Sequence, residues 1–241
     1  MTTNQTAKQL LSLLDLTRLQ EHDTEAAMQQ WLDQMATPSY VPAAFCVYPE
    51  FIAQTRRHLD AKAMQAFIAT VVNFPSGQLP LSDVLQQIED CVAVGADEID
   101  CVLPYQQVLQ GRYDEVAEFL SAVRQACGSK CLKVIIESGE LITPQQIIKA
   151  TELCLEAGAD FVKTSTGKVP VGCTTEAARA MLTVIAASGK VAGFKASGGV
   201  RTLAQAQELL QMFEHIMATT ATAKVMRIGA SALLDELKPL L

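Results

Sequence analysis

Two lysines lie in segments where a charged side chain is unfavourable. Lys163 follows the apolar residues Phe161 and Val162 in FVKTSTGK, and Lys195 follows Gly193 and Phe194 in GFKASGG. An ionised amine in such a strand must be paired with a counter-charge or lose its proton. Burial and a neighbouring cation both favour the neutral amine, which can attack a carbonyl carbon and form a Schiff base. The sequence therefore indicates carbonyl chemistry, unless one lysine extends to the rim to bind phosphate or pairs with Asp100.

A carboxylate is expected beside these amines. Asp100 and Lys163 each stand five residues beyond a helix-ending glycine, in the related segments VGADEID and AGADFVK. Since side chains alternate along a strand, both should point to the same side of the sheet. Asp100 could then transfer protons directly or through a water molecule. A permanent salt bridge between Asp100 and Lys195 is the competing interpretation.

The elements that would position these residues alternate between short β-branched runs and helical patterns, which is typical of an α/β fold with a parallel sheet. About eight strands close a (β/α)8 TIM barrel of roughly 250 residues. We therefore expect one barrel domain over residues 1–241, with a short N-terminal helical segment. The expected strands are 13–16, 44–48, 68–73, 98–102, 132–137, 160–164, 191–195 and 224–228.

The sequence predicts the boundaries of two helices. Thr143, Pro144 and Gln146 form an N-cap, a first-turn proline and a capping box, which predicts a helix over 144–157 that stops at Gly158. An apolar stripe between residues 84 and 92 predicts another helix, which ends at Gly95.

Polar residues recur at the expected carboxyl ends of the strands, the face on which barrel active sites lie. Asp15 and Cys46 belong to this set, although a buried free thiol is the commoner state of such a cysteine. Glycines and small polar residues follow the last three strands, where loops and helix N-termini of this fold bind phosphate. The candidate phosphate ligands are Thr166, Gly167, Lys168, Gly198, Gly199, Gly229 and Ser231, while Arg201 could meet phosphate or solvent.

Composition excludes several classes of protein. Nineteen Lys and Arg against 26 Asp and Glu give a net charge of −7, spread along the chain, so neither nucleic acid nor a membrane surface is an expected partner. No signal sequence or membrane span is evident, and seven cysteines without a C-x-x-C pair suit a reducing, cytoplasmic compartment. Three scattered histidines lack ligand spacing, so no metal site is expected. P-loop and dinucleotide-binding motifs are absent as well.

The motifs extend over nearly the whole chain. They are LLDLT at 13–17, VNFPSG at 72–77, GADEIDCVLPY at 95–105, LKVIIESGEL at 132–141, GADFVKTSTGK at 158–168, GFKASGGVRT at 193–202 and RIGASALL at 227–234. On these residues the chain resembles the deoxyribose-phosphate aldolases. These class I, metal-independent enzymes interconvert 2-deoxy-D-ribose 5-phosphate with acetaldehyde and D-glyceraldehyde 3-phosphate.

The resemblance implies that Lys163 forms the Schiff base, that Lys195 perturbs it and shares proton transfer, and that Asp100 belongs to the proton relay. It implies that the glycine-rich segments surround a phosphosugar, with Thr17 of the LLDLT motif among the substrate-binding residues. It also implies a (β/α)8 barrel without a cofactor, often a homodimer, that acts on phosphosugar and aldehyde substrates in deoxyribonucleotide catabolism.

Three features depart from the family pattern. Ala196 and Ser197 stand where proline and alanine are frequent, Ala232 replaces a second serine, and the sequence ends at LKPLL without a tyrosine-ended tail. These changes bear on proton transfer and phosphate contacts rather than on Schiff-base formation. Another Schiff-base sugar-phosphate aldolase or dehydratase, or a non-catalytic phosphosugar-binding barrel, remains an alternative.

Overall fold

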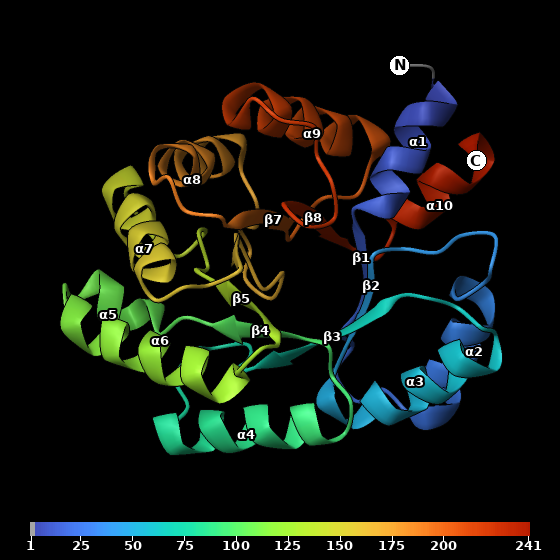
Figure 1. Cartoon of the computed structure of the whole chain (residues 1–241), viewed down its shortest axis with the longest axis horizontal. Helices are drawn as coiled ribbons and strands as arrows, with labels where there is room; N and C mark the ends of the chain where they lie inside the picture. Colours follow the sequence, from blue (N-terminus) through green and yellow to red (C-terminus); the bar gives the residue numbers. More distant parts are fainter. Residues whose placement is uncertain (1–2) are drawn as a thin grey trace.

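The computed structural model describes residues 3–241, which form a closed, all-parallel barrel (Figure 1). In this part of the chain each strand pairs with its sequence neighbour, and β8 returns to pair with β1. The (β/α)8 barrel predicted from the sequence is confirmed. The strands are β1 Leu14–Arg18, β2 Ala44–Val47, β3 Phe67–Val72, β4 Glu98–Val102, β5 Cys131–Ile135, β6 Phe161–Lys163, β7 Gly193–Ser197 and β8 Met226–Ala230.

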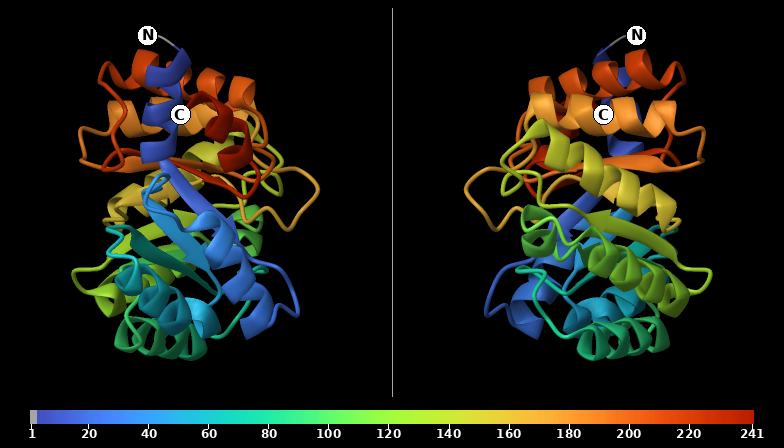
Figure 2. Two further views of the ribbon diagram at one scale, coloured as in Figure 1. Left: turned by 90° about the vertical axis from the view of Figure 1, so that its right-hand side faces the viewer. Right: turned by 90° about the vertical axis from the view of Figure 1, so that its left-hand side faces the viewer.

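A layer of helices surrounds the barrel, as the views in Figure 2 show. Helix α1 precedes the first strand and lies beside α10, and the side chain of Asn4 donates a hydrogen bond to the carbonyl of Leu240 at 2.6 Å. The helices are α1 Thr3–Ser12, α2 Glu25–Met35, α3 Ile52–Ala61, α4 Leu81–Ala93, α5 Tyr105–Leu109, α6 Tyr113–Cys127, α7 Pro144–Glu156, α8 Thr175–Ala187, α9 Leu203–Met217 and α10 Leu233–Leu237. Short 3-10 turns occupy Pro49–Phe51 and Lys238–Leu240.

The two faces of the barrel wall differ in chemistry. Outward-facing strand residues such as Leu14, Phe45 and Ile99 belong to the large apolar core beneath the helices. Inside the barrel, a small apolar cluster of Ala44, Cys46, Ala69 and Val71 fills the side formed by β2 and β3. Most of the remaining interior is occupied by charged side chains, which form the site described below.

Most predicted boundaries hold within two residues. Strand β4 has the predicted bounds, and α7 begins at Pro144 with the expected capping box between Thr143 and Gln146. Strands β7 and β8 begin two residues later than predicted, at Gly193 and Met226. Val191 suggested an earlier start to β7, but it lies in the loop before the strand with 98% of its surface exposed. Lys195 is therefore at the middle of its strand rather than at its end.

Candidate active site

The two lysines predicted to act together are adjacent on neighbouring strands. Lys163 ends β6, Lys195 lies on β7, and the two residues are in register. Both Nζ atoms contact the same carboxylate oxygen, Oδ2 of Asp100, at 2.8 Å from Lys163 and 2.7 Å from Lys195. The structure thus brings together all three predicted catalytic residues, and Asp100 bridges both amines rather than pairing with one.

A closed ring of alternating charges lies beneath Lys163. Its members in order are Asp100, Lys133, Glu98, Arg227, Asp15 and Lys195, which contacts Asp100 again. The six contacts between successive members measure 2.8, 2.5, 2.6, 2.6, 2.5 and 2.7 Å in that order. No member is more than 3% exposed. Each buried charge of the ring therefore has at least two partners of opposite sign, the arrangement that an ionic group needs away from water.

The protonation states follow from this geometry. Burial lowers the pKa of Lys163, the Asp100 carboxylate opposes that effect, and the Lys195 ammonium lowers the pKa further, so that it ends below the ordinary lysine value. For Lys195 the carboxylates of Asp100 and Asp15 outweigh burial and raise the pKa. Burial alone would raise the pKa of Asp100, but the ammonium groups of Lys133, Lys163 and Lys195 hold it well below the usual range. Lys163 is thus the amine most readily deprotonated.

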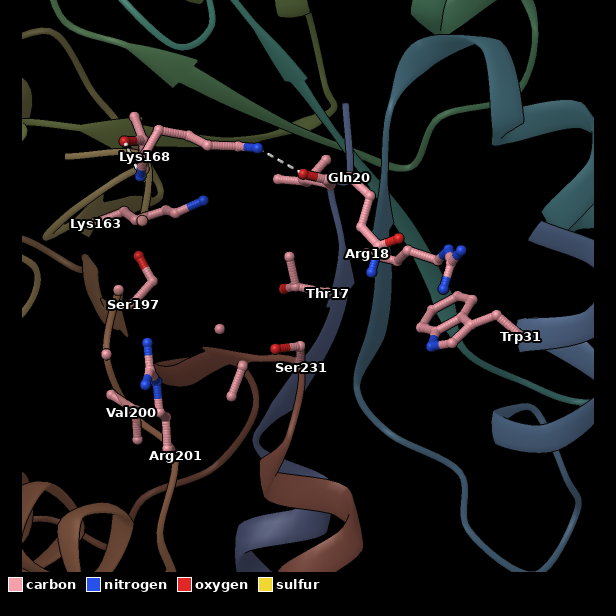
Figure 3. Close-up of a pocket in the computed structure, with 17 residues that line it drawn as sticks. Thr17, Arg18, Gln20, Trp31, Lys163, Lys168, Ser197, Val200, Arg201 and Ser231 are labelled. Atoms are coloured by element: carbon pink, nitrogen blue, oxygen red, sulfur yellow. Dashed lines mark hydrogen bonds between the residues drawn. The ribbon is translucent and has the colours of Figure 1, made fainter. Parts of the chain in front are cut away.

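A cavity of about 300 Å³ opens above Lys163 at the carboxyl end of the barrel (Figure 3). Figure 3 shows the amine of Lys163 pointing into this space, with Thr17, Ser197 and Ser231 around it. Among the predicted substrate-binding residues, those that line the cavity are Thr17, Thr166, Gly167, Lys168, Gly198, Gly199, Gly229 and Ser231. The cavity therefore joins the nucleophilic amine to the glycine-rich loops.

Besides Lys163, three cationic side chains of the described residues border the cavity, and one of them, Arg18, is paired with Asp23 at 2.5 Å. Lys168 extends across from the loop after β6 and donates a hydrogen bond to the carbonyl of Leu19 at 2.7 Å, as Figure 3 shows. Arg201 lies on the loop after β7, and its guanidinium points toward the cavity on the side of Ser197. Lys168 and Arg201 both lie where they can reach an anionic group of a ligand in the cavity.

The loops that form the cavity pack closely on one another. A side chain at Gly172 would place its Cβ 2.1 Å from the carbonyl oxygen of Gly198, so only glycine fits there. Gly198 itself has a φ of 81°, in the left-handed region that glycine adopts freely. Nearby, buried Glu137 accepts hydrogen bonds from the backbone and hydroxyl of Thr166, the latter at 2.5 Å. These contacts fix the position of Thr166 and of the glycine-rich backbone at the cavity wall.

The chain is similar to known aldolases in sequence and in fold. Residues 10–238 match the family model of the DeoC/LacD family aldolases. The chain belongs to this aldolase family. A candidate deoxyribose-phosphate aldolase from Coccidioides immitis is 27% identical, with a TM-score of 0.85 over 97% of this chain and 85% of that one. An aldolase named QR15 is 29% identical, with a TM-score of 0.80 over 95% of this chain and 96% of that one.

More distant relatives share the fold. The deoxyribose phosphate aldolase from Aeropyrum pernix is 23% identical, with a TM-score of 0.78 over 98% of this chain and 95% of that one, and its structure is tetrameric. In residues 3–241 of this aldolase, no helix is long and apolar enough to cross a membrane. No group of His, Cys, Asp and Glu side chains in the same range is placed to hold a metal ion.

Two predicted substrate-binding residues of the aldolase lie below the cavity lining. Asp15 is fully buried and contacts Lys195 and Arg227, so it stands in the ionic ring. Cys46 is also fully buried, in the small apolar cluster inside the barrel. Burial raises the pKa of its thiol, which stays neutral. For both residues, direct contact with substrate stays a prediction.

Three charged residues of the ring were missed by the sequence reasoning. Glu98 begins β4, Lys133 lies on β5, and Arg227 lies on β8. The criterion that identified Lys163, a charged residue inside an apolar strand, applies equally to all three. Applied to every strand, it would have found the whole ring.

Proposed function

We propose that this aldolase cleaves 2-deoxy-D-ribose 5-phosphate to D-glyceraldehyde 3-phosphate and acetaldehyde, reversibly, through a Schiff base on Lys163. The observation that carries the proposal is the buried amine of Lys163, which points into a cavity bordered by cations while contacting Asp100 at 2.8 Å. A barrel that only bound phosphosugars would have no need of a buried nucleophilic amine at that point. The dimeric state and the cytoplasmic location stay predictions.

The reaction begins with the neutral amine. Lys163 Nζ attacks the aldehyde carbon of the open-chain sugar to form a carbinolamine. Its hydroxyl takes up a proton from the relay of Asp100, Lys195 and water and leaves as water, which gives an iminium ion. The cationic nitrogen then accepts the electron pair of the bond between the second and third carbons. That bond breaks as the hydroxyl of the third carbon gives its proton to the relay of Asp100, Lys195 and a water molecule, which releases glyceraldehyde 3-phosphate and leaves an enamine on Lys163.

The remaining steps need a proton donor. The second carbon of the enamine takes up a proton through the relay of Asp100, Lys195 and a water molecule. Water then hydrolyses the acetaldehyde iminium and restores the amine of Lys163. Lys168, Arg201 and the glycine-rich backbone hold the phosphate, which fixes the reacting carbon near Lys163.

The test is to trap the intermediate. The protein is incubated with acetaldehyde, reduced with borohydride and mapped by mass spectrometry, and we expect a two-carbon addition at Lys163. Formation of glyceraldehyde 3-phosphate and acetaldehyde from 2-deoxyribose 5-phosphate is measured in parallel. If the adduct forms at Lys163 but 2-deoxyribose 5-phosphate does not give these two products, the protein is another Schiff-base aldolase or a dehydratase. An unmodified Lys163 would overturn the proposal.

The cations at the cavity should act on the phosphate alone. Lys168→Met and Arg201→Met are each expected to raise KM for 2-deoxyribose 5-phosphate about tenfold or more, since each removes a charge-assisted contact. The kinetics with unphosphorylated 2-deoxyribose should change little, which makes that sugar the control. Equal losses with both sugars would show that these residues act on the reacting end instead.

A further inference from the structure

The charges of the ring and of Lys163, taken together, balance only when Lys163 is neutral. In the part of the chain that the structure describes, the ring contains three cations and three carboxylates. Lys163 is attached to it as a seventh member, through Asp100. With Lys163 neutral the set carries no net charge, whereas a protonated Lys163 leaves one uncompensated positive charge away from water, which is costly.

We propose that the ring, whose charges sum to zero, keeps the Lys163 amine uncharged, and that Glu98, Lys133 and Arg227 are positioning residues of the reaction. This inference deepens the proposed function and rests on it. Neither Glu98 nor Arg227 borders the cavity, so they act on the amine through the ring rather than on the substrate.

The ring is held rigidly at its far end. The guanidinium of Arg227 lies over the rings of Phe67 and Phe161, at 5.8 and 5.5 Å from their centroids. Its Nε donates to the carbonyl of Ala223. The phenyl group of Phe161 fits only because residue 193 is glycine. A Cβ at that position would lie 2.3 Å from Cε1 of Phe161. This packing fixes the position of Arg227. Burial by itself would lower the pKa of the guanidinium, but the carboxylates of Asp15 and Glu98 raise it, so Arg227 stays ionised and the charge of the ring is constant.

Charged and titratable groups on the surrounding elements also face Lys163. These are Asp100 on β4, Lys195 on β7, the Cys46 thiol on β2 and Glu137 beyond β5. Asp15, Lys133 and Arg227, on β1, β5 and β8, are linked to it through the ring. The variants proposed below leave Asp100, Lys195, Cys46 and Glu137 in place, so a change in the protonation of Lys163 reports on the ring.

The inference predicts shifts of opposite sign from two nearly isosteric substitutions. Glu98→Gln leaves an excess positive charge, which disfavours the ammonium form of Lys163. Lys133→Met leaves an excess negative charge, which favours it. The acid limb of kcat/KM should move to lower pH in Glu98→Gln and to higher pH in Lys133→Met, by about one pH unit each.

Two further variants separate charge from structure. The double variant Glu98→Gln with Lys133→Met is neutral again, so its acid limb should return toward that of the unaltered protein. Arg227→Lys preserves the charge and should move the limb little, whereas Arg227→Met should move it as Lys133→Met does. These comparisons keep the inference testable if one single variant fails to fold.

The experiment measures the rate of borohydride trapping with acetaldehyde between pH 5 and pH 10, alongside kcat/KM. If the unaltered protein shows no trapping at any pH, the proposed function fails. If it shows trapping with a clear acid limb, but Glu98→Gln and Lys133→Met leave that limb in place or move it in the same direction, the inference about the ring is overturned. A merely structural role would lower the rates without these opposed shifts.

Discussion

Lys163→Met should abolish aldol cleavage while leaving the protein folded. Among Lys133, Lys163 and Lys195, the lysines of the ring and its seventh member, only Lys163 lines the cavity in the described part of the chain, and the substitution removes its amine. We expect kcat/KM to fall about 10⁵-fold or more, the scale of loss when a covalent nucleophile is removed. No two-carbon adduct should form in the cavity after borohydride reduction.

Lys163→Met should not lower the stability of the protein, whereas the loss of one partner of a buried ion pair usually does. Asp100 keeps its contacts with Lys133 and Lys195, so the ring stays intact and neutral. Because burial lowers the pKa of Lys163, the folded state gains nothing from its ammonium form. The free energy of unfolding, measured in denaturant at pH 7, should therefore stay the same or rise.

A matched control is available on the surface. Lys149 lies on α7, 3.8 Å from Glu152, and Lys149→Met should retain both activity and the adduct. An adduct formed in the cavity of Lys163→Met, or activity within tenfold of the unaltered protein, would assign the nucleophile to another residue.

The sequence predicted the barrel and the reactive trio for one physical reason. A lysine or aspartate inside an apolar strand is conspicuous, and alternation along a strand gives its direction, so Lys163, Lys195 and Asp100 could be placed together. The glycine-rich loops could be placed at the cavity because the fold itself determines on which end the loops meet.

The pairing of the ring members could not be predicted in the same way, although their identity could. Asp15 and Arg227 are 212 positions apart and meet only because β8 closes on β1. Glu98 contacts Arg227 across the barrel interior rather than through a neighbouring strand. Pairings of this kind depend on barrel closure and strand register, and the bounds of β7 and β8 were the least accurate part of the prediction.

Asp100→Asn should interrupt proton transfer rather than adduct formation. The substitution keeps the shape of the side chain but removes the carboxylate that contacts Lys163 and Lys195. We expect kcat for cleavage to fall about 10²- to 10⁴-fold, the usual contribution of a general acid-base group. Exchange of the methyl protons of acetaldehyde with D2O, followed by NMR, should fall by a similar factor, because that exchange passes through the enamine.

The direction of the pKa change excludes a simpler explanation. The Asp100 carboxylate raises the pKa of Lys163, so its removal lowers that pKa and increases the fraction of neutral amine at pH 7. A protonated nucleophile therefore cannot account for the lost activity. Borohydride trapping at saturating acetaldehyde should still modify Lys163 in full, although the approach to saturation is slower.

Stability should fall at the same time, because the substitution leaves one cation of the ring uncompensated. Breaking a buried ion pair by removing one partner typically costs about 3–5 kcal/mol in unfolding free energy. Asp97→Asn is the matched control, since Asp97 pairs with Arg56 at the outside of the barrel and is partly exposed. That variant should keep the exchange rate of the unaltered protein. Full trapping with slow exchange in Asp100→Asn would establish Asp100 as the proton relay, whereas loss of trapping would show that it is needed to form the Schiff base itself.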